Sequence, residues 1–329
     1  MMNLRAFGRL GWQVSEIGYG MWGMGGWTGS DDGESARSLD RAIALGCNFF
    51  DTAFAYGMGK SEKLLGDALR RHQDKKLYAA TKVPPKNWKW PGSAEVSASE
   101  TFPADHIKEY TEKSLENLGV DTIDLQQLHV WSDAWAPDEG WQRAADDLKR
   151  QKVIRGFGIS VNRWQPANVL AALETGLVDS VQVVYNIFDQ NPEDELFPAC
   201  VERNVAVIVR VPFDEGSLTG TLTKDSKWPE GDWRNIYFTP EHLAETLERV
   251  ERVKRVVPPG MGLPELALRF ILANPAVSTV IPGMRKTAHV DRNLGASDGR
   301  PLISSTIAII TPSNTSAHGS LRVRIPLMM

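Results

Sequence analysis

The segment NFFDTAFAYGMGKSEKLLG, residues 48–66, decides how the whole chain is interpreted. A short apolar strand ends at Asp51, a loop with glycines carries Tyr56, and a helix begins at Ser61. An acid directly after a strand lies in a βα loop, where rigid scaffolds usually present functional side chains. A plainer interpretation is also open, in which Asp51 caps a turn and Tyr56 is a half-buried loop aromatic. The other strands of the chain distinguish between the two.

The rest of the chain repeats this alternation of strand and helix. Eight strand-like runs end in polar residues: VSEIGYG, CNFFD, LYAATK, TIDLQQLH, VIRGFGIS, DSVQVVYN, VAVIVRV and VSTVIPG. Helices are expected over about 32–45, 61–71, 103–118, 139–149, 165–174, 193–203, 240–256 and 264–272, and from about 287. The predicted fold class is therefore α/β, a single (β/α)8 TIM barrel over residues 1–302 with an N-terminal β-hairpin over Leu4–Ser15.

A doubly wound nucleotide-binding fold is the main alternative, because Gly18 to Gly23 form a G-x-G-x-x-G motif after a strand. In that fold the helix that binds the pyrophosphate begins within the glycines. Here residues 24–30 separate the last glycine from the predicted helix, and Met21 and Trp22 would crowd the approach. We therefore reject the doubly wound fold.

The composition points to a protein that acts on small molecules. The chain has 329 residues, a formal charge of −4 and no block of Lys and Arg, which argues against nucleic acid or a membrane surface as partner. The N-terminal segment lacks an apolar targeting region and no stretch is long and apolar enough for a membrane span, so we expect a cytoplasmic protein. Cys47 and Cys200 are expected to be buried thiols, although a disulfide between them stays open. The sequence specifies no oligomeric state.

Polar residues stand at the ends of most predicted strands: Asp51, Lys82, His129, Ser160, Gln182 and Arg210, with Tyr56 just beyond the second strand. In a barrel the second, third and fourth strands are neighbours, so Asp51, Lys82 and His129 should converge with Tyr56 above them. A tyrosine, whose pKa is ordinarily about 10, donates a proton at neutral pH only if a nearby cation stabilises the phenolate. Lys82 held by Asp51 would supply that cation, and His129 would orient a carbonyl oxygen or relay the proton.

A site that protonates an alkoxide also needs a hydride donor, and no side chain can serve as one, so a nicotinamide cofactor is implied. A metal-dependent barrel hydrolase is the alternative chemistry, because Asp51 and His129 could be ligands. It requires more His or carboxylate ligands at strand ends than the sequence offers, and we predict no metal.

Over roughly residues 3–302 the chain resembles the aldo-keto reductase family. FFDTAFAYGMGKSEKLLGDAL resembles the signature around the catalytic Asp and Tyr of that family, Thr81-Lys82 its lysine strand and LQQLH its histidine strand. The resemblance implies that Asp51, Tyr56, Lys82 and His129 form the catalytic tetrad. It also implies that NADP(H) binds without a Rossmann domain and passes hydride directly to an aldehyde or ketone.

The resemblance further implies which residues contact the cofactor. GISVN and SVQVVYN resemble the motifs that hold the nicotinamide amide, RVPFDEGSLTG the loop over the pyrophosphate, and IPGMRKTAHVDRN the adenine end, where Arg285 would bind the 2′-phosphate. Arg210 departs from the family pattern, in which an aromatic residue often stacks on the nicotinamide, and His289 replaces a frequent glutamine. Without its motif, Arg285 would be interpreted as a surface cation at a helix start. The expected cofactor-binding residues are Gly20, Met21, Trp22, Asp51, Ser160, Asn162, Gln182, Arg210, Pro212, Phe213, Gly216, Gly283, Arg285, His289 and Asn293.

Two features leave the biological role open. Eight tryptophans fall in segments after strands and either wall an apolar carbonyl pocket or only pack the loops: Trp22, Trp27, Trp88, Trp90, Trp131, Trp135, Trp228 and Trp233. Residues 303–329 lack acidic residues, unlike the helical sequence before them, and we expect an atypical tail, diverged or frameshifted, that alters one wall of the substrate pocket. An NADP-binding sensor with little turnover on the same fold remains the alternative to a reductase.

Overall fold

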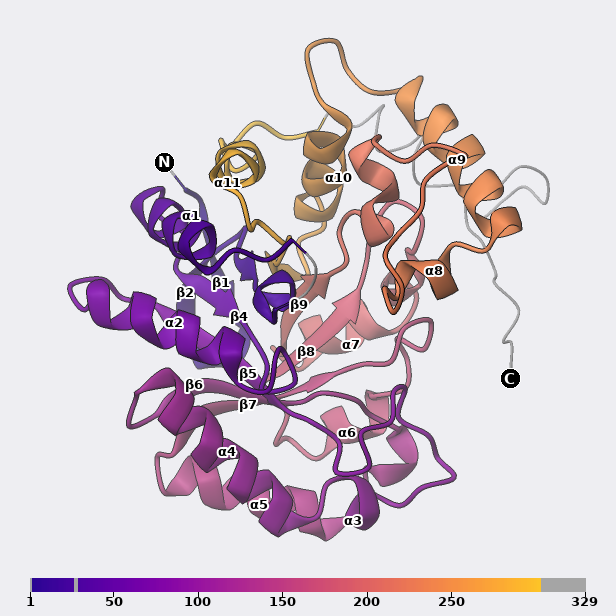
Figure 1. Cartoon of the computed structure of the whole chain (residues 1–329). Helices are drawn as coiled ribbons and strands as arrows, with labels where there is room; N and C mark the ends of the chain where they lie inside the picture. The colour runs from indigo at the N-terminus through magenta and orange to yellow at the C-terminus, as the bar shows by residue number, and fades with distance from the viewer. Residues whose placement is uncertain (1, 27–28, 303–329) are drawn as a thin grey trace.

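Eight parallel strands form a barrel in the computed structural model, which describes residues 2–26 and 29–302 (Figure 1). Each strand pairs with its neighbours in chain order, and parallel bridges Ile17–Val280 and Gly20–Gly283 bring the first and last strands together. The predicted (β/α)8 barrel is therefore confirmed. Its strands are β3 (Tyr19–Gly20), β4 (Phe49–Asp51), β5 (Tyr78–Val83), β6 (Ile123–Leu128), β7 (Ile154–Ser160), β8 (Ser180–Val184), β9 (Ala206–Arg210) and β10 (Val277–Val280).

The predicted N-terminal hairpin is also confirmed and closes one end of the barrel. Strands β1 (Leu4–Phe7) and β2 (Trp12–Ser15) pair antiparallel, and Gly11 at their turn has φ 66°, which favours glycine. Phe7 and Val14 are buried in a cluster with Phe49 and Tyr78, the first residues of β4 and β5. Because the hairpin covers the amino ends of the strands, the polar strand ends lie at the opposite, open end.

Most helices match their predicted ranges. These are α1 (Asp32–Ala44), α2 (Lys60–Arg71), α4 (Ala104–Leu118), α5 (Glu139–Arg150), α9 (Pro240–Lys254), α10 (Leu263–Leu272) and α11 (Thr287–Leu294). Their apolar faces cover the barrel: in α5, Trp141, Ala144, Ala145 and Leu148 are buried at helical spacing. Asp138 caps this helix by accepting from the amide of Gly140 at 2.8 Å.

Two predicted helices were placed too early. The range 165–174 is helical only in α6 (Leu170–Glu174), because Trp164 has φ +63° and Pro166 disfavours helical geometry in the residue before it. Likewise α7 (Leu196–Glu202) begins after a separate 3-10 turn over Asn191–Glu193. Two short helices lie in segments predicted as loops, α3 (Ala98–Thr101) and α8 (Arg234–Tyr237).

The remaining structural expectations have mixed outcomes. Cys47 and Cys200 are both free and buried, as expected, and no disulfide joins them. None of the helices in the described part of the chain has the length and apolar character that crossing a membrane requires. The atypical tail over 303–329 lies outside the described residues, so the hypothesis about its origin stays a prediction.

Candidate active site

A buried ion pair joins the ends of two neighbouring strands at the open end of the barrel. Asp51, the last residue of β4, is 2% exposed, and Lys82 in β5 is 0% exposed. The Lys82 Nζ donates to Asp51 Oδ1 at 2.5 Å and to the Thr52 carbonyl at 2.7 Å. A buried charge needs a partner of this kind, since an isolated one would be very costly to desolvate. The pair therefore holds the Lys82 ammonium at a defined place just inside the open end of the barrel, which we call the mouth.

Two glutamines complete the surroundings of the Asp51 carboxylate. Its Oδ2 accepts from Gln182 Nε2 at 2.7 Å and from Gln127 Nε2 at 3.2 Å. Gln182 was expected to contact the cofactor, and the structure places its amide nitrogen on Asp51. Gln127 was missed by the sequence analysis. The signal was present, because residues two apart on a strand share a face, so Gln127 points to the same side as His129.

Tyr56 and His129 lie against each other above this ion pair. Their ring centroids are 5.6 Å apart in an edge-to-face arrangement, and Lys82 Nζ lies 5.1 Å from the Tyr56 ring centroid. Trp90 contacts the His129 ring from another side, with centroids 5.6 Å apart. The structure thus brings together all four residues of the predicted tetrad.

The surroundings set the protonation of the two rings. Burial raises the pKa of the Tyr56 phenol, against the opposing effect of the nearby cations Lys82 and Arg210. Burial, together with the same two cations, holds the pKa of His129 well below its usual range. At neutral pH Tyr56 is therefore a neutral hydroxyl donor and His129 a neutral imidazole. His129 Nδ1 is buried and has no hydrogen-bond partner among the described residues.

The next strand ends carry the groups expected to hold a nicotinamide amide. Ser160 on β7 and Gln182 on β8 are register partners, and both are buried. Asn162 instead bridges to the loop after β5: its Nδ2 donates to the Gly92 carbonyl at 2.8 Å, and its Oδ1 accepts from the Gly92 amide at 3.1 Å. Asn162 therefore joins two loops at the mouth.

Arg163, which the sequence analysis did not single out, holds the segment that follows β9. We name Val211–Gly220 the strap; it contains Pro212, Phe213 and Gly216. Arg163 donates to Glu215 at 2.6 Å, to Asp214 at 3.2 Å and to the Tyr237 hydroxyl of α8 at 3.0 Å. Asp214 and Glu215 have φ of 44° and 53°, a left-handed backbone that is uncommon outside glycine. The strap thus combines backbone hydrogen bonds of its own, such as that from the Asp214 amide to the Val211 carbonyl at 3.2 Å, with the side-chain contacts to Arg163.

The residues expected at the adenine end follow β10. Gly283 and His289 are exposed, Arg285 is half-buried and Asn293 is buried, all at or near the start of α11 or along it. A Cβ at Gly23 would lie 2.9 Å from Arg285 Cδ, so this glycine makes room for the arginine side chain.

Three further positions assigned to the cofactor lie at the end of β3, and two of them, Gly20 and Met21, have structural roles. A Cβ at Gly20 would lie 2.5 Å from the Ile281 carbonyl oxygen, so glycine is required there for barrel closure. The Met21 side chain is fully buried, whereas Trp22 is 50% exposed. Of the two side chains, only that of Trp22 reaches the surface.

Comparison with known proteins identifies the family. The family model described as the aldo/keto reductase family matches residues 16–314. The chain belongs to the aldo/keto reductase family. It is 32% identical over 308 residues to the uncharacterized oxidoreductase YqkF of Bacillus subtilis, covering 93% of this chain and 94% of that one.

Two further matches extend over most of the chain. The NADH-specific methylglyoxal reductase of Escherichia coli is 28% identical over 297 residues, covering 86% of this chain and 90% of that protein. The structure of aldo-keto reductase AKR11C1 from Bacillus halodurans in its holo form superposes with a TM-score of 0.74 at 29% identity, covering 94% and 95% of the two chains. Aldo/keto reductases are oxidoreductases that bind nicotinamide cofactors and act on small carbonyl compounds.

The mouth of this aldo/keto reductase fits a nicotinamide cofactor. Arg210 Nε is buried without a hydrogen-bond partner among the described residues. Because buried donors are normally hydrogen-bonded, this group can donate to an acceptor on a bound cofactor. A Cβ at Gly216 or Gly283 would meet nothing within 4 Å, so the strap and the β10 loop leave open space beside them. Within the described residues, no three His, Cys, Asp or Glu side chains gather as metal ligands.

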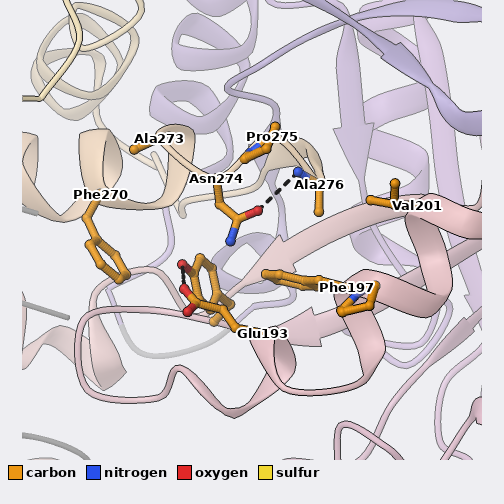
Figure 2. Close-up of a pocket in the computed structure, with 10 residues that line it drawn as sticks. Glu193, Phe197, Val201, Phe270, Ala273, Asn274, Pro275 and Ala276 are labelled. Carbon is orange, nitrogen blue, oxygen red and sulfur yellow. Dashed lines mark hydrogen bonds between the residues drawn. The ribbon is translucent and has the colours of Figure 1, made fainter. Parts of the chain in front are cut away.

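Two hollows lie outside the group of predicted catalytic and cofactor-binding residues. One, of about 500 Å³, lies between α7 and α10, where Phe197 and Phe270 form its walls and the Ala276 amide donates to Asn274 (Figure 2). A second, of about 830 Å³, lies beside the mouth between the loops that carry Gly92 and Trp164. None of the candidate residues is among the described residues that line either hollow.

The tryptophans divide between two roles. Trp90 contacts His129 and belongs to the mouth, whereas Trp131 and Trp135 are buried in the core. Others in the described loops are partly exposed: Trp22, Trp88 and Trp233. Trp27 lies outside the described residues. The expectation of an aromatic-walled pocket thus has direct support at Trp90, and the loop-packing interpretation holds for Trp131 and Trp135.

Proposed function

We propose that this aldo/keto reductase is an NADPH-dependent carbonyl reductase in which Tyr56 is the general acid. The observation that carries the proposal is the cluster of Lys82, Tyr56 and His129 at the open end of the barrel, with the ammonium 5.1 Å from the centroid of the phenol ring. When bound, the cofactor supplies the hydride that reduces the carbonyl carbon.

The side chains of this chain then handle the proton. The Tyr56 hydroxyl donates a hydrogen bond to the substrate oxygen and transfers its proton as negative charge develops there. The phenolate left behind is stabilised by Lys82, which stays in place because Asp51 and the Thr52 carbonyl hold it. His129, kept neutral by burial and by the cations, orients the same oxygen by hydrogen bonding.

The test is NADPH oxidation with a panel of aromatic and aliphatic aldehydes, comparing the parent with Tyr56→Phe. We expect turnover to fall roughly 10²- to 10⁴-fold while NADPH affinity changes little. Tyr110→Phe is the matched control, because Tyr110 is a partly buried tyrosine on α4 whose ring contacts Phe54 and His106. Equal turnover in the parent and Tyr56→Phe would contradict the proposal. A parent that binds NADPH but reduces nothing would favour the sensor.

The preference for NADPH over NADH is proposed from Arg285. A guanidinium recognises the 2′-phosphate dianion that NADH lacks, so Arg285→Ala should weaken NADPH binding about tenfold or more and leave NADH binding unchanged. Lys286→Ala, which removes the neighbouring exposed cation, is the control. Equal affinity of the parent for NADH and NADPH would overturn this preference; one relative, from Escherichia coli, is named as NADH-specific.

A further inference from the structure

Arg210 occupies a defined place among the groups of the mouth. It ends β9, where it is the register partner of Val184 on β8. Its Nη2 donates to the carbonyl of Val161, the residue after Ser160, at 2.9 Å. Because β8 lies between β7 and β9, the side chain crosses over the end of β8. The guanidinium is therefore held next to the strand ends that carry Ser160 and Gln182.

The charge of Arg210 is less compensated than that of the other cations at the mouth. Lys82 pairs with Asp51, and Arg163 pairs with Asp214 and Glu215. Among the described residues Arg210 makes no such ion pair, and its buried Nε has no acceptor. The acidic groups whose charges act on Arg210 are Glu215 and, more weakly, Asp189, and both of them also act on Arg163. The mouth thus holds a cation whose field is only partly balanced.

The positive charge of Arg210 acts on the His129 ring, which lies in the same site. Lys82 and Arg210 both disfavour a proton on its ring, in addition to burial. An oxidised nicotinamide is likewise an aromatic ring that carries a positive charge, whereas the reduced ring is neutral. The field that keeps the imidazole neutral therefore acts against the oxidised ring as well.

We propose that Arg210 makes the site prefer reduced, uncharged nicotinamide over the oxidised, cationic form. This inference rests on the proposed function, since the hydride must reach a carbonyl held at Tyr56 and His129, which places the ring within range of the same guanidinium. At an effective dielectric constant of about 20, two charges several ångströms apart interact strongly enough for a difference of about tenfold or more in affinity. Such a difference favours loading with NADPH and release of NADP⁺.

The experiment measures dissociation constants for NADPH and NADP⁺ by quenching of protein fluorescence, in the parent and three variants. Arg210→Met removes the charge, and Arg210→Lys retains it. Arg155→Met is the matched control, because Arg155 lies on the same strand as Ser160 but pairs with Asp124 and has a 57% exposed side chain. Circular dichroism and thermal melts establish that each variant folds.

We expect the parent and Arg155→Met to bind NADPH at least about tenfold more tightly than NADP⁺. That ratio raises the midpoint potential of the bound couple by about 30 mV per tenfold. In Arg210→Met the ratio should fall to within about threefold of unity, and Arg210→Lys should retain most of the parent ratio.

An Arg210→Met ratio equal to that of the parent would overturn the inference, as would a parent that binds both forms equally. An Arg210→Lys variant that behaves like Arg210→Met would also overturn it, because the Val161 contact and not the charge would then be responsible. Any of these three results with Tyr56-dependent turnover intact leaves the proposed function standing. If the parent binds neither nucleotide, the proposed function fails together with the inference.

Discussion

Two buried ionic clusters stand at the open end of the barrel, and they are supported in different ways. In the first, Asp51, Lys82, Gln127 and Gln182 all come from strands, and backbone ladders fix their relative heights: Lys82 is the register partner of Gln127. In the second, Arg163 comes from a loop, Asp214 and Glu215 from the irregular 3-10 segment Asp214–Thr219, and Tyr237 from the short α8. The residues of the first cluster are fixed by the sheet, whereas those of the second are joined to one another by side-chain bonds between segments that each have only local backbone hydrogen bonds.

Because of this difference, we expect the two clusters to serve different functions, one in proton transfer and the other in holding the strap. The strand cluster lies against Tyr56 and His129, so the groups that we propose for proton transfer are preorganised before any ligand arrives. The loop cluster holds the strap, whose residues Asp214 and Glu215 adopt left-handed backbone geometry. Disrupting the first should therefore damage the fold and turnover together, and disrupting the second should mainly change how nucleotide is held.

Removing the cation of the strand cluster should have the largest effect. Lys82→Met leaves Asp51 buried without its charge partner, so we expect the free energy of unfolding to fall by about 3–5 kcal/mol and turnover to be nearly abolished. Urea denaturation and the aldehyde assay measure the two effects. The matched control is Lys113→Met on the exposed pair with Glu109, where we expect a change of about 0.5 kcal/mol or less. Similar losses in both variants would contradict the contrast between buried and exposed pairs.

Removing the cation of the loop cluster should have an intermediate effect. Arg163→Met deletes the bonds to Asp214, Glu215 and Tyr237, and we expect the unfolding free energy to fall by about 1–3 kcal/mol. NADPH should dissociate about tenfold faster, which stopped-flow fluorescence measures. The rate of hydride transfer in a single turnover should stay close to that of the parent. If that rate falls as far as in Lys82→Met, the two clusters are not separable.

The smallest effect on the free energy of unfolding is expected from the titration of Asp189, whose carboxyl interacts electrostatically with the loop cluster. Burial raises the pKa of Asp189 to about 6, above its usual value, despite the attraction of Arg163 and Arg210. Between about pH 4 and 6 the folded state keeps a proton that the unfolded state has lost, so stability falls as pH rises through this window. Asp189→Asn removes this penalty and should gain about 2 kcal/mol relative to the parent on going from pH 4 to pH 7. Denaturation at both pH values measures the difference; a pH-independent difference would contradict the assignment.

The sequence alone predicted the barrel, the hairpin and the convergence of Asp51, Tyr56, Lys82 and His129. These predictions succeed because strand periodicity and chain order determine which strand ends are neighbours in a parallel barrel. Helix starts were less accurate where local turns interrupt an apolar pattern, as before Leu170 and Leu196. Assignments at Ser160, Asn162 and the adenine end came from family resemblance and stay proposals.

Only the tertiary structure decided the contacts between segments that no repeating pattern in the sequence relates to each other. The Asn162 bridge to Gly92, the three bonds of Arg163 and the path of Arg210 over β8 all join loops or strands far apart in the chain. Such contacts depend on loop conformations and side-chain rotamers, which the surrounding packing selects. The sequence therefore determined which groups stand at the mouth, and the tertiary structure decided which charges are paired there. That pairing sets the electrostatic field at the site, because the field of each charge is added to or cancelled by that of neighbouring charges, and only the folded chain brings these neighbours together.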